Sequence, residues 1–325
     1  MGIAYAAPYV PPAPPVSPWR GVALSWTGWD GSEWDLTRPA SGLFLRPGVR
    51  GLGLPTFERK SSSSPMIAGS RHRGTSTNDR EVFWPLYLYS DKGSTEFMER
   101  DRAFWRSLDT EREGTWTVSL PDGSRRSLGL RLTGAEDDWT HDPIQRGWAG
   151  YGIELLADQP YWIGETIRKS WDQDDLRNYY ITEEDRVTYG YPDDVIHYIS
   201  PGGTLDSATF TNDGDVPSYP VWTVIGPTTA VSFGVGAGRV VVPFEIPAGY
   251  AAQIDTDPVS GQVLWYGEWE PGSKTITGAI DRTSELDPTS AFLPIPAGQD
   301  MPLSFTMSGL GTIIAEVRNK YRRAT

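Results

Sequence analysis

Carboxylate pairs two residues apart come closest to a catalytic arrangement in this sequence. Asp255 and Asp257 form one such pair, and Glu268 and Glu270 form another. Residues two apart on a strand point to the same side, about 7 Å from each other, and glycoside cleavage uses two acids about 5 to 10 Å apart. However, Asp255 and Asp257 precede Pro258, where aspartates are ordinary turn residues. We therefore do not expect hydrolysis.

Other catalytic and metal-binding arrangements are missing from the sequence. The three histidines, His72, His141 and His197, lie in predicted loops without a serine motif of the nucleophile-elbow type. The chain contains no cysteine, so thiolate zinc sites and cysteine nucleophiles are excluded. There is no glycine-rich phosphate loop, and the acidic residues do not have the spacing of a calcium loop. We predict that the protein is not an enzyme and needs no cofactor or metal.

The composition favours many short strands joined by turns. The 325 residues include 35 glycines, 27 prolines and 14 tryptophans, and the length allows two domains with separate cores. The 42 acidic and 29 basic residues give a net charge of -13, which argues against stable binding to nucleic acid. No signal peptide and no apolar stretch of about 20 residues is present, so we expect no membrane insertion.

The first 36 residues divide into an arm and a hairpin. Prolines concentrated between positions 8 and 18 predict an extended arm over residues 1–20. This arm is either a tail along a neighbouring subunit, which we favour, or a ligand for an aromatic groove. Residues 21–36 alternate around a turn at 29–32 and predict a two-stranded hairpin. Its tryptophans indicate core or subunit contacts more than a sugar-stacking platform.

The best helix of the chain is predicted over residues 95–108. Its apolar side chains share one face of a 3.6-residue period, and charged side chains occupy the other face. Ser94 is the expected N-cap. The residues of the apolar face are Phe97, Phe104, Trp105 and Leu108.

Alternating or β-branched runs predict strands on both sides of this helix. Residues 81–89 form one, and residues 148–157 form another. Residues 114–120 and 127–133 predict a hairpin, with its turn at Pro121-Asp122-Gly123. Residues 61–79, rich in serine and then basic, predict a flexible loop. Its positive charge in an acidic protein would suit pairing with a neighbour's carboxylates.

The second half of the chain predicts a sandwich. Residues 165–207 are acidic, rich in tyrosine and irregular, with one or two strands near 186–190, and we interpret them as a connector. After them, short β-rich runs separated by turns favour an antiparallel sandwich of the jelly-roll type. These runs cover residues 221–225, 231–235, 239–244, 250–255, 261–266, 275–279, 292–294, 303–307 and 313–321.

The order of these parts carries a family resemblance. Five features together resemble the N-terminal belt domain of the distal tail proteins of long-tailed bacteriophages. They are the run Gly51-Leu52-Gly53-Leu54-Pro55, the segment 69–73, the strand that leads into a helix, the 121–123 turn and the segment 159–164. These proteins are also called siphovirus tail components or minor tail proteins. The segments 211–222, 225–227, 251–257 and 295–298 are similar to the galectin-like C-terminal domain of the same family.

This resemblance implies a mainly β fold in which the N-terminal arm, residues 1–20, stands outside the family core. A belt-type β-sandwich with one helix would occupy residues 21–164, a connector 165–207, and a galectin-like jelly roll 208–325. It also implies that the 61–79 loop orders against a neighbouring subunit or the tail tube, an alternative to a plain solvated loop. The candidate inter-subunit contacts are Ser70, Arg71, His72 and Arg73.

The implied function is that of a structural virion protein, made in the host cytoplasm and located at the phage tail tip. A homo-oligomeric ring, a hexamer in this family, would join the tail tube protein to the tip or baseplate and the receptor-binding proteins. DNA would pass through its lumen without stable binding. A carbohydrate-binding module that attaches to the host envelope through the second domain is the alternative.

Overall fold

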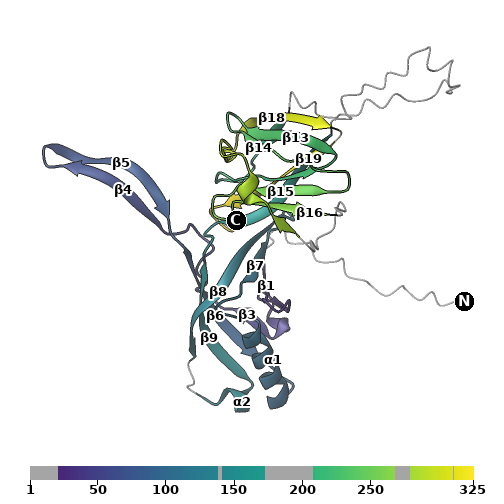
Figure 1. Cartoon of the computed structure of the whole chain (residues 1–325). Coiled ribbons are helices and arrows are strands. Elements are labelled where there is room, and N and C mark those ends of the chain that lie inside the picture. Colours follow the sequence, from purple (N-terminus) through teal and green to yellow (C-terminus); the bar gives the residue numbers. More distant parts are fainter. Residues whose placement is uncertain (1–20, 138–140, 173–207, 268–278, 310) are drawn as a thin grey trace, which may run out of the picture.

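Two packed regions make up the protein, as Figure 1 shows for the computed structural model. The structure describes residues 21–137, 141–172, 208–267, 279–309 and 311–325. One hydrophobic core gathers residues between positions 26 and 162 together with Ala324, and we call the region around it the first lobe. A second core gathers residues between positions 171 and 317, and we call that region the second lobe. The prediction of a mainly β fold is confirmed.

The first lobe is a sandwich whose two sheets share one bent strand. The first half of β8 pairs with β7, and its second half pairs with β9, with an irregularity between Leu132 and Gly134. One sheet continues from β7 through β1 to β2, and the other continues from β9 through β6 to β3. The strands are β1 Ala23–Thr27, β2 Glu33–Asp35, β3 Leu43–Leu45, β6 Arg80–Tyr89, β7 Gly114–Ser119, β8 Arg125–Asp137 and β9 Trp148–Ala157. Each strand predicted in this region is present.

Tryptophans fill the space between these sheets. Trp84 of β6 lies 5.3 Å from Trp26 and 5.4 Å from Trp116, measured between ring centroids, and Trp162 lies 5.1 Å from Trp116. All four side chains are buried. The first two contacts are edge-to-face, the geometry that aromatic pairs prefer and that adds about 0.5 to 1.5 kcal/mol per pair. The predicted core role of the hairpin tryptophans therefore holds for Trp26.

Helix α1 Ser94–Arg106 covers one edge of this core. Phe97 and Phe104 are buried, whereas Trp105 is only half buried and packs edge-on against Tyr151. The N-cap position belongs to Gly93, so the expectation of a Ser94 cap is wrong. Ser94 already lies in the helix, and its hydroxyl donates to the carbonyl of Ile144 in the short helix α2 Pro143–Arg146.

The second lobe is a sandwich of two antiparallel sheets. One runs in the order β17-β16-β15-β12-β19-β10, and the other in the order β11-β18-β13-β14. Trp222 packs on Phe233 across the interior, with 4.8 Å between the ring centroids. The strands are β11 Thr209–Thr211, β12 Val221–Ile225, β13 Thr228–Val235, β14 Val240–Val242, β15 Ala251–Asp255, β16 Gln262–Tyr266, β17 Ile280–Asp281, β18 Asp300–Gly309 and β19 Thr312–Tyr321.

Some of the predicted segments differ from the structure, and others lie outside the described residues. Residues 292–294 do not form a strand. Ile295 makes an isolated bridge to Ser218, and the prolines at 294 and 296 that flank it have no N–H to extend the pairing. The 275–279 run lies almost wholly outside the described residues, as do the 1–20 arm and the 186–190 segment. The expectation that irregular chain begins at residue 165 is wrong, since β10 Trp162–Asp172 is a continuous strand.

Strand β10 and the C-terminal residues connect the two lobes. Ile163 of β10 pairs with Ser127 of the first lobe, and β10 pairs with β19 of the second lobe from Trp162 to Asp172, with an irregularity between Ile163 and Thr166. After β19 the chain returns to the first lobe, where Ala324 is buried and its N–H donates to the carbonyl of Leu52. The lobes are therefore joined both by a shared sheet and by this return. Among the described helices, neither is long and apolar enough to cross a bilayer.

Truncation of the helix face tests this packing. We expect Phe104→Ala to lower the free energy of unfolding by about 3 to 5 kcal/mol, because the ring is fully buried. Trp105→Ala should cost less, about 1 to 2 kcal/mol, because half-burial leaves a smaller cavity. Urea denaturation of the two variants measures both values. Equal losses, or no loss in Phe104→Ala, would contradict the assignment of Phe104 as the buried anchor.

Candidate functional site

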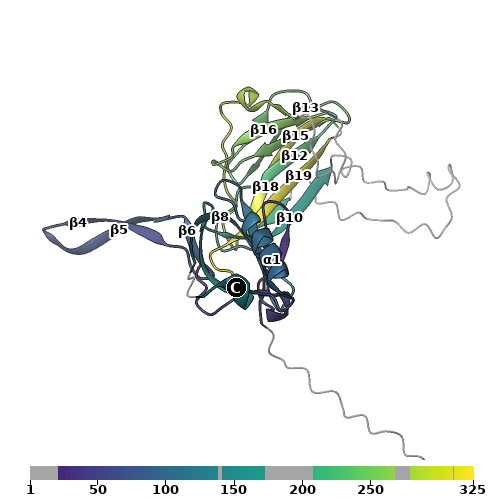
Figure 2. The same cartoon turned by 90° about the horizontal axis from the view of Figure 1, so that it is seen from below.

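A long β-hairpin projects from the first lobe, and Figures 1 and 2 both show it standing away from the remaining described elements. It consists of β4 Phe57–Ser64 and β5 Ile67–Thr77, which pair only with each other. All side chains of β4 are exposed, and eight residues of strand span about 25 Å. We call residues 57–77 the docking arm.

The prediction of a flexible loop over residues 61–79 is wrong. Ser61, Ser62 and Ser63 pair in register with His72, Arg71 and Ser70, and irregularities interrupt the ladder on both sides of this stretch. The serine- and glycine-rich composition led to the loop prediction. A hairpin can have this composition because neither of its faces is buried. Without a buried face, strands have no alternation of apolar residues for a sequence pattern to reveal.

The four candidate contact residues all lie on β5 and are exposed. Ser70, Arg71 and His72 pair with consecutive serines of β4, whereas Arg73 is the extra residue at the register shift between His72 and Gly74. Arg73 donates through Nε to Ser62 Oγ at 2.9 Å. With Arg59 and Lys60 on β4, and Glu58 as its single carboxylate, the docking arm is basic within an acidic protein. Whether these residues contact another subunit stays a prediction.

The docking arm leaves both of its outer edges without a strand partner among the described residues. A two-stranded hairpin is marginally stable in water, and free edges are templates for pairing with another chain. At its base, Asn78 donates its backbone N–H to the Thr56 carbonyl, and the Tyr161 hydroxyl donates to Thr77 Oγ1 at 2.9 Å. The arm is thus anchored at its root and free along its length.

Arg80, the first residue of β6, holds this root together. Its guanidinium donates to four backbone carbonyls, and the side chain is buried. The acceptors are Pro160 at 2.6 Å, Gly51 at 2.7 Å, Gly53 at 2.5 Å and Arg322 at 2.8 Å. Burial lowers the pKa of Arg80 to about 10, so the group stays charged at neutral pH. One side chain therefore ties the segment before the arm to the C-terminal residues.

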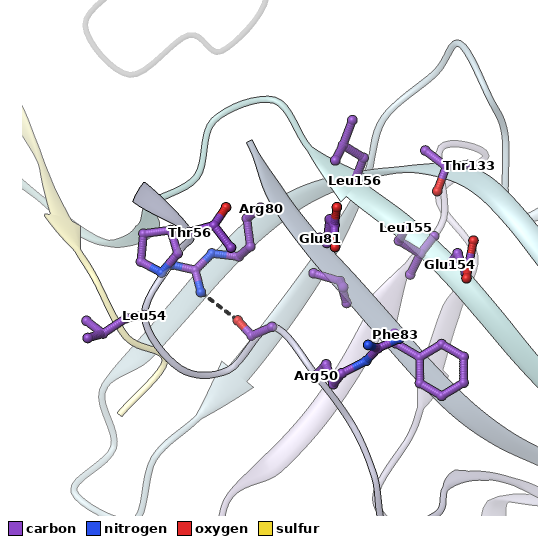
Figure 3. A pocket seen from close by; sticks show the side chains of 13 residues that line it. Arg50, Leu54, Thr56, Arg80, Glu81, Phe83, Thr133, Glu154, Leu155 and Leu156 are labelled. Atoms are coloured by element: carbon purple, nitrogen blue, oxygen red, sulfur yellow. Dashed lines mark hydrogen bonds between the residues drawn. The ribbon is translucent and has the colours of Figure 1, made fainter. Parts of the chain in front are cut away.

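A hollow of about 550 Å³ opens beside this root. Figure 3 shows Arg50 directed toward Phe83, and Glu81 and Glu154 on neighbouring strands of the same face. The Arg50 guanidinium lies 4.8 Å from the centre of the Phe83 ring, a cation–π contact. Gly51 has a φ of +105°, and a Cβ there would lie 2.6 Å from Val82 Cγ2, so only glycine fits this turn.

The proposed catalytic alternatives do not assemble into a site in the described residues. Asp257 accepts the backbone N–H of Val259. Asp255 accepts the backbone N–H of Asp257 and the hydroxyl of Ser260, as turn residues do. Glu268, Glu270 and His197 lie outside the described residues. His72 lies on the docking arm and His141 beside Trp148, and no group of metal-ligating side chains forms within the described ranges.

Sequence reasoning missed Arg80 and the hollow beside it. The only signal was an arginine directly before an apolar strand, which is equally typical of a solvated strand end. The acceptors of Arg80 are carbonyls 27 to 242 residues away along the chain, and no side-chain pattern marks them.

Comparison with solved structures places this architecture. No family model and no curated protein matches the sequence. The crystal structure of SPP1 Dit, described as a paradigm of the hub adsorption apparatus in phages infecting Gram-positive bacteria, superposes with a TM-score of 0.59 at 13% identity, over 93% of this chain and 99% of that one. This chain has the Dit fold.

Chains of the phage P2 baseplate are also similar in structure to this chain. In the activated conformation with Ca, the TM-score is 0.54 at 12% identity, covering 93% of this chain and 99% of that one. In the activated conformation with Sr, it is 0.52 at 11% identity, covering 91% and 98%. The match extends over both lobes, so the resemblance first seen in separate motifs applies to the fold of nearly the whole chain.

Replacing Arg80 by lysine tests the root of the docking arm. We expect Arg80→Lys to lower the free energy of unfolding by about 2 to 3 kcal/mol, because a lysine keeps the buried charge but cannot reach all four carbonyls. Arg59→Lys on the exposed arm, the matched control, should change it by less than about 0.5 kcal/mol. Thermal and urea denaturation measure both. An Arg80→Lys protein as stable as the wild type would rule out this role.

Proposed function

We propose that this protein is a structural hub of a phage tail, a ring that joins the tail tube protein to the tip or baseplate proteins. The observation that carries the proposal is the match to Dit over both lobes, with almost all of the SPP1 chain covered. A Dit fold alone does not specify a function. The chain adds an anchored basic arm with free edges, which suits a subunit that contacts its neighbours.

The position of the docking arm supports a ring. The arm extends away from its own first lobe, so in the proposed ring its side chains would contact a neighbouring molecule. A contact between an arm on one side and a different surface of the next copy is heterologous, and such contacts form a ring when the rotation between copies closes. We propose six copies on the family resemblance. The four candidate contacts, Ser70, Arg71, His72 and Arg73, would lie at this interface.

Electrostatics support such a contact. The protein carries 13 more negative than positive charges, whereas the docking arm carries four basic residues and one acidic residue. Opposite potentials steer the arm of one copy toward the acidic surface of the next and disfavour contact between two arms. In this arrangement the division into an N-terminal arm at 1–20, a belt at 21–164, a connector at 165–207 and a jelly roll at 208–325 is part of the proposal, except that residues 165–172 belong to β10 and pair with β19 of the second lobe. The site of action is the virion tail tip.

Charge reversal on the docking arm tests the interface. We expect Arg71→Glu with Arg73→Glu to weaken self-association at least about tenfold, because like charges then meet across the contact. Light scattering at several concentrations and negative-stain images measure the assembly. The control, Arg38→Glu with Arg146→Glu, changes two exposed arginines away from the arm and should assemble like the wild type. Rings formed by the double arm variant would refute the arm's role, and a wild-type monomer at all concentrations would refute the ring.

A hub that transmits DNA must not retain it. We expect the assembled ring to bind no duplex DNA at about 0.15 M salt, because an acidic lumen repels phosphates and a basic one would hold them by counterion release. The basic residues Arg71 and Arg73 would then face protein. A mobility-shift assay on assembled rings measures this. Retention of DNA, or a channel wall lined by Arg71, Arg73 and Arg125 in a ring structure, would contradict the proposal.

A further inference from the structure

A second hollow, of about 230 Å³, lies on the outer face of the second lobe. It crosses four neighbouring strands, β16, β15, β12 and β19, which are all labelled in Figure 2. Alternate residues of these strands, such as Trp222, Ile254 and Val317, point into the core. The residues between them, among them Gln253 and Glu316, line the hollow. The described part of this surface is therefore built from strands.

The floor of the hollow is oriented by hydrogen bonds. Gln253 Oε1 accepts the hydroxyl of Tyr266 at 3.2 Å, and Gln253 Nε2 approaches Thr223 Oγ1 at 3.5 Å. Asp255 Oδ2 accepts the hydroxyl of Ser260 at 2.6 Å. A carboxamide offers two donors and two acceptor lone pairs, and a carboxylate has about four acceptor positions. Both groups are thus held in place with capacity for further hydrogen bonds.

Two groups at the rim have no hydrogen-bond or ion-pair partner among the described residues. Arg318 of β19 and Gln262 of β16 both line the hollow, and both are exposed. Glu316 is paired with Arg168, with 3.4 Å between Nε and Oε1. The rim therefore supplies a free guanidinium and a free carboxamide opposite the fixed groups of the floor.

The charges in and around the hollow balance. Asp255 and Glu316 are negative, and Arg318 and Arg168 are positive. A balanced site does not select phosphates, as a cluster of arginines would, nor amines, as a carboxylate cluster would. Mixed donors and acceptors a few ångströms apart match neighbouring hydroxyl groups, each of which both donates and accepts. The aliphatic side chains of Val221 and Leu264 complete the lining and suit the C–H faces of a sugar.

We propose that this hollow is a subsite for a neutral sugar residue of a glycan. No aromatic ring is among the described residues that line it, so we expect one copy to bind weakly, with a dissociation constant on the order of millimolar. Several copies held in a ring raise the affinity for a repetitive glycan through effective concentration. Only this gain rests on the proposed ring; the subsite itself belongs to each chain.

Saturation-transfer NMR on the full chain tests the subsite with free sugars. The neutral probes are glucose, galactose, rhamnose and N-acetylglucosamine, and the anionic probes are glucuronic acid and glycerol phosphate. We expect transfer to at least one neutral sugar at millimolar concentration, and weaker transfer to both anions. No transfer to any neutral sugar, or stronger binding of an anion, would overturn the proposal.

Two exposed substitutions locate the binding. Arg318→Ala with Gln262→Ala should weaken sugar binding about tenfold or more, because both free hydrogen-bonding groups are removed. The matched control, Arg125→Ala with Gln145→Ala, removes the same residue types from the exposed surface of the first lobe and should leave binding unchanged. Equal binding by the two double variants would refute this location. Light scattering on the same samples reports the ring separately, so failure of one proposal is distinguishable from failure of the other.

Discussion

The burial of the Arg80 guanidinium is the constraint on which the relation between the lobes depends. A buried cation is costly unless its hydrogen bonds are satisfied, and here the acceptors are all backbone carbonyls. Those carbonyls belong to the segment before the docking arm, to the corner between β9 and β10, and to the C-terminal residues. The guanidinium N–H groups find their acceptors in three segments at once. Displacement of any one segment therefore leaves at least one N–H group without an acceptor. The root of the arm and the end of the chain are therefore ordered together.

The docking arm, unlike the buried Arg80 side chain, is exposed along most of its length. Its base is braced by Tyr161 and by the backbone of Thr56, yet its length buries no apolar face. A hairpin of this kind gains little from its own side chains, and it would gain most from a partner that covers its edges. The tryptophan-lined core beneath it supplies the rigidity that the arm lacks. A packed lobe that carries a hairpin with unpaired outer edges is a suitable subunit for an assembly.

The two hollows differ in the chemistry they offer. The one at the arm root combines Arg50 over Phe83 with two nearby glutamates, and it adjoins a segment that we assign to protein contacts. The one on the second lobe is balanced in charge, and its described lining residues are polar, charged or aliphatic, among them the hydrogen-bonded side chains of Gln253 and Asp255. Burial of the first in a ring and exposure of the second would let one chain use its first lobe for assembly and its second lobe for weak, repeated contacts with sugars.

The sequence by itself determined the local elements and the excluded chemistry. Alternation in β6, β7 and β9, the helical period of α1 and the Asp122-Gly123 turn are properties of neighbouring residues, so they could be predicted with bounds close to those observed. The absence of cysteine removed thiolate sites outright. The paired strands of the docking arm, the Arg80 contacts and both hollows were decided only by tertiary structure. An exposed hairpin carries no periodic signal, and the partners of Arg80 and Arg318 depend on which distant strands become neighbours.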